Sequence, residues 1–324
     1  MSFSDIPPVE SAAFYMDLSL RRARENCDQR GFGSIRDPLL RNKKKSGFKL
    51  RAMCDELRIV LDRILKTYPR VDELTPFYQD LIKTTIDYPY LKRSFGAIIW
   101  SLQKIQEFET QGNRKISASR NADDVIMHHK KIIGRLASIM KQLQPHLEFL
   151  ETARKVFRSY PTIKHGMKTI CIAGFPNVGK STLLSKVTPA TPEINEYAFT
   201  TKGLNLGYMK FGHEKVQFID TPGTLDRPEK MNVIEKQAHL VMKHEATHIV
   251  YVFDVMNEVA IEDQERLYKR IKKLEKPVLL YLTKLDIAPK ADVDAVVAAY
   301  PEIITNLADL DVQFNKIAKE KSEE

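Results

Sequence analysis

The stretch Gly174-Phe175-Pro176-Asn177-Val178-Gly179-Lys180-Ser181 decides the fold of the second half of this chain. It fits the spacing GxxxxGK[ST] of a phosphate-binding loop, which joins a buried strand to a helix. Glycine lets successive backbone N–H groups approach phosphate oxygens where a side chain would block them. The apolar residues 169–173 are expected to form the strand, and the helix is expected to begin at Lys180. The stretch therefore predicts a nucleotide ligand.

The side chains of this phosphate loop (174–181) predict how the phosphates are held. Lys180 is expected to reach the β- and γ-phosphates, and the Ser181 hydroxyl is expected to coordinate magnesium. The following helix directs its positive dipole end toward the same place. The predicted nucleotide contacts from this part of the chain are Phe175, Pro176, Asn177, Val178, Gly179, Lys180, Ser181 and Thr182.

A second motif predicts a nucleotide-dependent switch. The apolar residues 216–219 lead into Asp220-Thr221-Pro222-Gly223, which has the form DxxG. Asp220 is expected to hold magnesium through water, and the Gly223 amide is expected to sense the γ-phosphate. Thr201, in the segment between the two motifs, is predicted to close over magnesium when the γ-phosphate is present. An ordinary Thr pair leading into a strand over residues 204–211 is the alternative interpretation of that segment.

A third motif indicates the base. After the apolar residues 278–282 comes Thr283-Lys284-Leu285-Asp286, which matches [NT]KxD. Asp286 is expected to accept hydrogen bonds from guanine N1 and N2, donors that adenine lacks, and Lys284 is expected to lie along the base plane. Thr283 replaces the more usual Asn and so removes one side-chain amide that ties this loop to the phosphate loop. The motif favours GTP and GDP over adenine nucleotides.

Composition predicts two domains of different charge. The chain has 324 residues, 43% of them hydrophobic, which is enough for two cores of ordinary size. Residues 1–164 hold 30 Lys+Arg against 19 Asp+Glu, and residues 165–324 hold 21 against 23, so the net charge of +9 comes from the first half. Such asymmetry indicates a polyanionic partner, for which RNA is sufficient.

The first half is predicted to be helical throughout. Leu57, Leu61, Ile64 and Tyr68 recur at helical spacing, and a second stripe runs through residues 132–150, where Pro145 should kink or interrupt the helix. An up-and-down bundle is the simplest arrangement. The second half alternates strands and helices and is predicted to be a Ras-like α/β domain with a mostly parallel sheet, ending on a helix that carries Leu310, Phe314 and Ile317. The predicted fold class is thus an all-α helical bundle domain (1–164) followed by a Ras-like α/β P-loop GTPase domain (165–324).

Two basic segments of the first half are candidates for RNA contact. Residues 41–51 are expected to form a loop before the Leu57 helix, and Arg114, Lys115 and Arg120 flank a second loop. A solvated surface is the alternative for both segments. The candidate RNA-binding residues of the first segment are Arg41, Lys43, Lys44, Lys45, Lys49 and Arg51.

These motifs resemble those of the Obg-type translation-factor GTPases, and the likeness extends into the first half. Four stretches of the first half resemble the amino-terminal helical domain of the nucleolar GTP-binding protein 1 family. They are Ile6-Pro7-Pro8-Val9, Tyr68-Pro69-Arg70-Val71-Asp72-Glu73-Leu74, Pro76-Phe77-Tyr78 and residues 134–141. The resemblance implies a GTPase that uses magnesium and acts in assembly of the large ribosomal subunit, binding rRNA and precursor particles. Since eukaryotic members continue far beyond their GTPase domain, the resemblance implies a short, archaeal-type member, expected to be monomeric.

The chain departs from relatives at two places. Thr224 follows the DxxG motif where Ras-like enzymes place a water-orienting Gln, so slow intrinsic hydrolysis is expected. The last guanine-contacting loop should follow a strand at residues 302–304 and is reduced to Thr305-Asn306-Leu307, which leaves Asn306 as its candidate contact. Asn177 lies where potassium-activated relatives place an Asn that helps to hold K⁺ beside the phosphates. The predicted catalytic residues are Asn177, Lys180, Thr201 and Gly223, and the predicted magnesium ligands are Ser181, Thr201 and Asp220.

Other classes of function remain as alternatives or are rejected. A nucleotide-stabilised RNA-binding scaffold with negligible hydrolysis is the main alternative, and an ATP-using kinase has Asp286 against it. His244-Glu245-Ala246-Thr247-His248 matches HExxH, but the strand expected from Ile249 cuts short the helix that a zinc site requires. The three cysteines are widely spaced, which predicts a reducing compartment such as the cytoplasm. The sequence shows no leader pattern and no apolar stretch long enough to span a membrane, so no membrane partner is expected.

Overall fold

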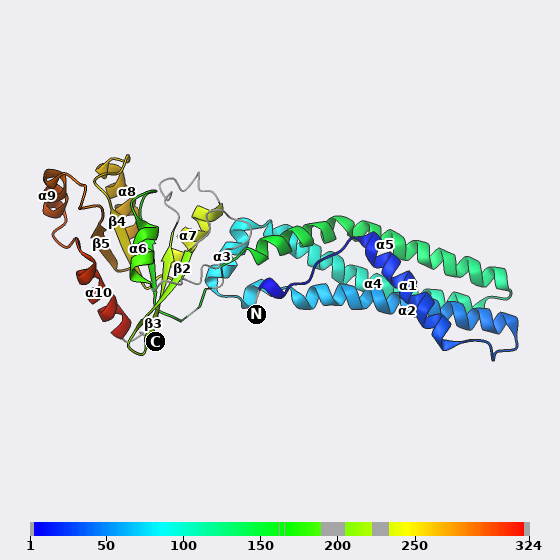
Figure 1. The fold of residues 1–324 in the computed structure, drawn as a ribbon. Coiled ribbons are helices and arrows are strands. Elements are labelled where there is room, and N and C mark those ends of the chain that lie inside the picture. The colour runs from blue at the N-terminus through cyan, green and yellow to red at the C-terminus, as the bar shows by residue number, and fades with distance from the viewer. Residues whose placement is uncertain (1–2, 162, 165, 189–204, 222–232, 321–324) are drawn as a thin grey trace. The chain divides into compact units, whose positions relative to one another are not determined.

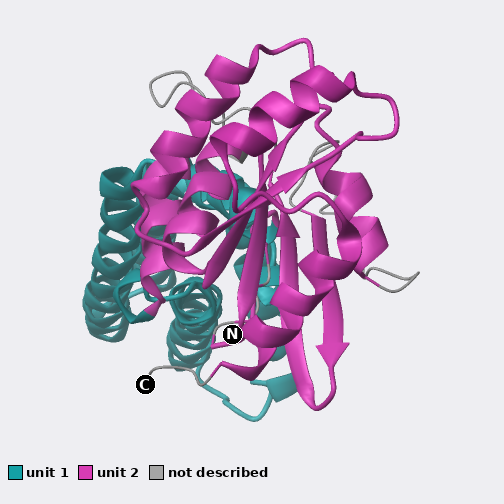
Figure 2. Ribbon diagram, turned by 90° about the vertical axis from the view of Figure 1, so that its left-hand side faces the viewer, with its two compact units in different colours: residues 1–73, 86–158 teal, residues 74–85, 159–324 magenta. Residues whose placement is uncertain are grey.

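The computed structural model describes residues 3–161, 163–164, 166–188, 205–221 and 233–320. Its contacts divide the chain into two compact units, coloured separately in Figure 2. Unit 1 comprises residues 1–73 and 86–158, and unit 2 comprises residues 74–85 and 159–324. Helices make up unit 1, and unit 2 contains a five-stranded sheet with helices, so the predicted fold class is confirmed.

Four long helices form unit 1 (Figure 1): α1 (Ala12–Arg30), α2 (Pro38–Thr67), α4 (Tyr88–Ala118) and α5 (Ala122–Arg158). Two short 3₁₀ turns accompany them, η1 (Phe3–Asp5) and η2 (Val71–Glu73). Asp37 and Asp87 cap the first turns of α2 and α4, where a proline follows and needs no N–H partner. The predicted stripes of α2 and α5 supply buried residues to the bundle core, among them Leu57, Leu61, Leu136 and Leu147.

Unit 1 differs from the sequence-based predictions at two places. The basic residues 41–51 lie inside α2 and not in a loop, because the cap at Asp37 starts the helix earlier than the Ser/Gly pair suggested. Of the kink or interruption predicted at Pro145, the interruption does not occur, because helix α5 continues through this proline. Leu143 and Leu147 are both buried on either side of this proline, and their packing holds the helix together although one backbone hydrogen bond is lost.

The sheet of unit 2 has the order β2-β3-β1-β4-β5. Its strands are β1 (Thr169–Ala173), β2 (Asn205–Phe211), β3 (Glu214–Asp220), β4 (His248–Phe253) and β5 (Val278–Leu282). Strand β2 is antiparallel to β3, and the remaining pairs are parallel. Because β1, β3, β4 and β5 run in one direction, the loops after all four strands meet at one edge of the sheet, where ligands of such folds bind.

Helices pack against this sheet (Figure 1): α6 (Lys180–Val187) contacts β1, β2 and β3, α8 (Ile261–Lys272) contacts β4, and α10 (Leu307–Lys319) contacts β3. Helices α7 (Val233–His244) and α9 (Lys290–Ala299) also belong to this unit. The predicted terminal helix is α10. Its Leu310, Phe314 and Ile317 are buried, and the Phe314 ring lies edge-on to Phe218 with centroids 5.0 Å apart.

Helix α3 (Pro76–Thr85) comes from the helical half of the sequence but belongs to unit 2 by its contacts. It packs against α7, where Asp80 Oδ2 lies 2.9 Å from His244 Nε2, and the Tyr78 hydroxyl donates to the Pro161 carbonyl at 2.7 Å. Phe77 and Leu81 are fully buried. The predicted domain boundary between residues 164 and 165 stays a prediction, and the contacts add that α3 folds with the second unit.

Candidate nucleotide-binding site

The phosphate loop connects β1 to α6 at the edge of the sheet where the parallel strands end. Gly179 caps α6 with φ +92°, a left-handed conformation that favours glycine. Gly174 has φ +150°, and a Cβ added there would lie 2.7 Å from the Val252 carbonyl oxygen of β4. Both glycines are therefore required by backbone geometry, and the loop is held close to the neighbouring strand.

Lys180 is the first residue of α6 and is 7% exposed. Its Nζ donates to the Phe175 carbonyl at 2.7 Å, so the ammonium lies across the mouth of its own loop. Burial lowers the pKa of Lys180, and the carboxylate of Asp220 acts in the opposite direction. A buried cation at the first residue of a helix provides a strong field for phosphate oxygens.

The predicted magnesium ligands Ser181 and Asp220 lie in contact. The Ser181 hydroxyl donates to Asp220 Oδ2 at 2.5 Å, and the Asn205 side-chain amide reaches the same oxygen at 3.2 Å. Asp220 Oδ1 is buried and has no hydrogen-bond partner among the described residues. A hydroxyl and a carboxylate with an unsatisfied oxygen form a donor set that suits a hard cation such as Mg²⁺.

Asn205 was missed by sequence reasoning. It is the first residue of β2 and pairs directly with Asp220 in the antiparallel register of β2 and β3. The hairpin turns at Gly212, which has φ +64°, and each of its two strands has seven residues. Counting back from the turn along both strands would therefore have placed Asn205 opposite Asp220.

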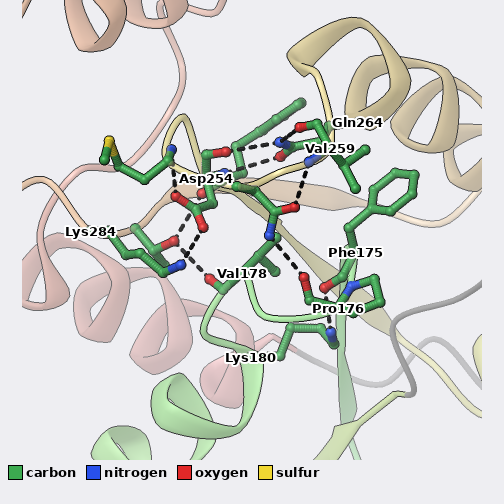
Figure 3. Close-up of polar contacts among 12 residues, drawn as sticks. Phe175, Pro176, Val178, Lys180, Asp254, Val259, Gln264 and Lys284 are labelled. Atoms are coloured by element: carbon green, nitrogen blue, oxygen red, sulfur yellow. Dashed lines mark hydrogen bonds and ion pairs between the residues drawn. The ribbon is translucent and has the colours of Figure 1, made fainter. Parts of the chain in front are cut away.

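The guanine-recognition loop (283–286) follows β5 and touches the phosphate loop (Figure 3). The Thr283 hydroxyl lies 2.8 Å from the Val178 carbonyl and 3.0 Å from the Phe253 carbonyl, so it donates to one of them at a time. Thr283 lacks the side-chain amide of the usual Asn, and its hydroxyl makes a contact to the phosphate loop in place of that amide. Lys284 has φ +58°, and Asp286 is exposed.

The segment before Asn306 forms less structure than predicted. Residues 302–304 do not make a strand; a single parallel bridge joins Ile304 to Tyr281 of β5. Asn306 is the N-cap of α10, and its Oδ1 accepts the backbone N–H of Asp309 at 2.8 Å. The Asn306 side chain is thus used in capping the helix.

The remaining predicted residues divide into two groups. Thr201 and Gly223, together with Thr224, lie outside the described residues. Asn177 is exposed in the phosphate loop with φ +63°, a conformation that Asn tolerates better than most residues. Of its neighbours, Phe175 and Val178 are buried, and Pro176 and Thr182 are exposed.

The two histidines of the HExxH match occupy different elements. His244 ends α7 and contacts Asp80, and His248 begins β4 with its Nε2 3.5 Å from Glu320 Oε2. No group of three or more His, Cys, Asp or Glu side chains able to hold a metal occurs among the described residues.

The basic segment of α2 divides into anchored and exposed side chains. The Arg41 guanidinium donates to the Ile35 carbonyl, Lys43 Nζ donates to the Ser117 carbonyl at 2.9 Å, and Arg51 lies 3.6 Å from Glu109. Lys44 and Lys45 are exposed, and Lys49 is half-buried. The bond from Lys43 to Ser117 brings the start of α2 beside the end of α4.

Comparison with known families accounts for both halves of the chain. Residues 3–164 match the NOG1 N-terminal helical domain, and residues 169–284 match the 50S ribosome-binding GTPase family. The chain belongs to the nucleolar GTP-binding protein 1 (NOG1) family. Its second half is a GTPase domain, which agrees with the three nucleotide motifs at the edge of the sheet.

Individual relatives give the range of this similarity. The chain is 34% identical to the uncharacterized protein MJ1408 of Methanocaldococcus jannaschii, over 88% of this chain and 81% of that protein. It is 30% identical to nucleolar GTP-binding protein 1 of Candida glabrata over 96% of this chain and 49% of that one, and 29% identical to the Saccharomyces cerevisiae protein over 99% and 50%. The chain thus spans about half the length of these two nucleolar relatives.

Among solved structures, Aquifex aeolicus Era bound to GDP and aluminium fluoride is 29% identical, with a TM-score of 0.38 over 48% of this chain and 58% of that chain. Within the described residues, no helix has the length and apolar character needed to cross a membrane.

Proposed function

We propose that this NOG1-family GTPase is a GTP-hydrolysing switch that acts on large ribosomal subunit precursors through rRNA. The observation that carries the nucleotide part is the meeting of Lys180, Ser181 and Asp220 at the end of the parallel strands, with Thr283 joined to the same loop. These four side chains come from the three nucleotide motifs of the sequence, and their proximity supports a guanine nucleotide as the ligand.

Magnesium fits the donor set of this site. Ser181 and Asp220 would hold the ion, with Thr201 as a further predicted ligand, and the ion would neutralise charge between the β- and γ-phosphates. The unsatisfied, buried Asp220 Oδ1 supports this assignment, because a buried carboxylate oxygen without a partner is costly in a folded protein.

The reaction would be an in-line attack of water on the γ-phosphate of GTP. Lys180 and the amides of the phosphate loop would stabilise the charge that develops on the phosphate oxygens. Gly223 would couple the presence of the γ-phosphate to the segment that follows it. The product of this chemistry is GDP and phosphate, and its result is a change in the affinity for the particle.

The RNA partner is supported by a basic end of unit 1. It comprises Lys43, Lys44 and Lys45 of α2, Arg114 and Lys115 near the end of α4, and Arg120 in the connection from α4 to α5. The connections from α1 to α2 and from α4 to α5 lie at the same end of the bundle (Figure 1). Lys43 crosses to the Ser117 carbonyl there, so the two basic segments form one surface. Phosphate contacts are the use for which six clustered cations are suited.

The proposal is tested by sedimentation with purified large-subunit precursors. The chain should be retained on the particles with a non-hydrolysable GTP analogue and released with GDP. Equal retention in both states would contradict a switch. We propose that the protein is a monomer. We also propose a cytoplasmic location, which the three buried cysteines without disulfide bonds support, because disulfides are rare in a reducing compartment.

Neutralising two exposed lysines of the basic end should weaken RNA binding. Lys44→Gln with Lys45→Gln leaves Lys43 and its bond to Ser117 in place, so the helices keep their contact. We expect weaker binding to rRNA and a slope of log affinity against log salt that falls by about one for each lost phosphate contact. Filter binding over a salt series measures both.

The matched control for this pair is Lys290→Gln with Lys319→Gln, two exposed lysines of unit 2. GDP affinity should remain unchanged in both double variants. An unchanged salt slope in the Lys44 and Lys45 variant would remove the basic end from the RNA-binding surface.

Asn177 is proposed to hold K⁺ beside the β- and γ-phosphates, which would replace the water-orienting Gln that Thr224 does not provide. Its exposed side chain in a left-handed loop position supports this role. Hydrolysis in potassium buffer should exceed that in sodium buffer by about tenfold or more, since an added cation at this place acts like an arginine finger. Equal rates in both buffers, with particles absent and present, would contradict the role.

A further inference from the structure

A buried acidic residue lies next to the guanine-recognition loop and was not part of the sequence motifs. Asp254 follows the last residue of β4 and is 0% exposed. Its Oδ2 lies 2.6 Å from Lys284 Nζ, and the two side chains point toward one another in Figure 3. Lys284 is the residue predicted to lie along the base, so a buried carboxylate holds the ammonium of a ligand-contacting side chain.

The surroundings of Asp254 fix its position. Its Oδ1 accepts the Met256 N–H at 2.9 Å. Its backbone N–H donates to Gln264 Oε1 at 3.1 Å, and its carbonyl accepts from Gln264 Nε2 at 2.8 Å. Gln264 belongs to α8 and is 1% exposed, so it clamps the residue from the body of the unit. These bonds hold Asp254 in place independently of Lys284.

The same connection from β4 to α8 (254–260) also reaches the phosphate loop. Asn257 Nδ2 donates to the Pro176 carbonyl at 2.9 Å, and Asn257 Oδ1 accepts the Val259 N–H at 3.0 Å. One short connection thus contacts Lys284 with its first residue and the phosphate loop with its fourth.

From these contacts we infer that Asp254 and Asn257 are positioning residues for nucleotide binding. Asp254 orients Lys284 against the base, and Asn257 fastens the phosphate loop to the same connection. Lys284 has φ +58°, an unfavourable conformation for a side chain of this size, and the ion pair to Asp254 stabilises it there. The inference rests on the proposed binding of a guanine nucleotide. It adds two residues to that site, Asp254 acting through Lys284 and Asn257 acting through the phosphate loop.

The first experiment measures dissociation of fluorescent GDP from Asp254→Asn. This change keeps the shape of the side chain and the acceptor for Met256, and it puts a neutral amide N–H₂ in place of the carboxylate oxygen that faces Lys284. We expect affinity for GDP to fall by about 10–100-fold through faster dissociation, the range found for bonds to charged groups. Asp294→Asn, at an exposed position of α9, is the matched control and should bind as the wild type does.

A double-mutant cycle separates positioning from a general structural role. Lys284→Met keeps the aliphatic stem along the base and removes the ammonium. In that background Asp254→Asn should change GDP affinity by less than about threefold, because the carboxylate has no ammonium left to hold. An equal loss in both backgrounds would show that Asp254 does not act through Lys284, and this result would overturn its assignment.

Asn257→Asp tests the second contact and stays informative if Asp254→Asn does not fold. The carboxylate still accepts the Val259 N–H but cannot donate to the Pro176 carbonyl. We expect about tenfold faster GDP dissociation, with Asn315→Asp on the exposed side of α10 as the control. Wild-type dissociation from Asn257→Asp would overturn its assignment, whereas failure of the wild-type chain to bind GDP would instead contradict the proposed function.

Discussion

Replacing Lys180 by alanine is expected to reduce single-turnover GTP hydrolysis by about 10²–10³-fold, the loss found when one preorganised charge-stabilising donor is removed. Lys180 is 7% exposed and bonded to the Phe175 carbonyl, so its ammonium is held within the loop and not in bulk water. A buried cation stabilises developing phosphate charge far more than an exposed one does. Hydrolysis is measured with radiolabelled GTP and enzyme in excess.

The control for this variant is Lys186→Ala, an exposed lysine on the same short helix. It should hydrolyse GTP at the wild-type rate. Removing Lys180 also removes a buried charge, so the fold should be retained, and circular dichroism checks this. A Lys180→Ala variant with wild-type hydrolysis would show that the phosphate loop does not act on the γ-phosphate.

Asp286→Asn is expected to exchange guanine for xanthine as the preferred base. The amide of the new side chain accepts from N1–H as before, but it presents a donor to position 2, where guanine carries an amino group and xanthine a carbonyl. Affinity for GTP should fall by about 10²–10³-fold, because a site built around hydrogen bonds strongly rejects a mismatched partner. Competition of GTP, xanthosine triphosphate and ATP for one labelled nucleotide measures the change.

Three results of this competition are informative. The wild type should bind GTP well above ATP, which separates a GTPase from an ATP-using kinase. The variant should prefer xanthosine triphosphate. If Asp286→Asn binds GTP as tightly as the wild type does, then the exposed Asp286 is not the residue that contacts the base.

The sequence predicted those parts of the site whose geometry follows from local backbone chemistry. The spacing of Gly174, Gly179 and Lys180 requires a strand, a tight loop and a helix, and all three are present. The fold class followed from the alternation of strands and helices. Pairings between distant segments were not predicted, because Asp254, Asn257 and Asn205 belong to no motif of fixed spacing.

Errors at the level of single elements have physical causes as well. Ser46 and Gly47 suggested a loop, but the cap at Asp37 and the buried residues that follow stabilise helix through them. Pro145 suggested a break, but buried leucines on both sides hold α5 together. Helix α3 contacts α7, which no local pattern indicates. In each case tertiary packing outweighed local propensity.

Single-turnover GTP hydrolysis, measured with purified large-subunit precursors absent and present, tests the central claim most directly. We predict slow hydrolysis by the chain alone and a marked acceleration on the particles, which is lost in Lys180→Ala and weakened in the variant that lacks Lys44 and Lys45. Negligible hydrolysis under both conditions, despite tight GTP binding, would contradict the account and would identify a nucleotide-stabilised RNA-binding scaffold.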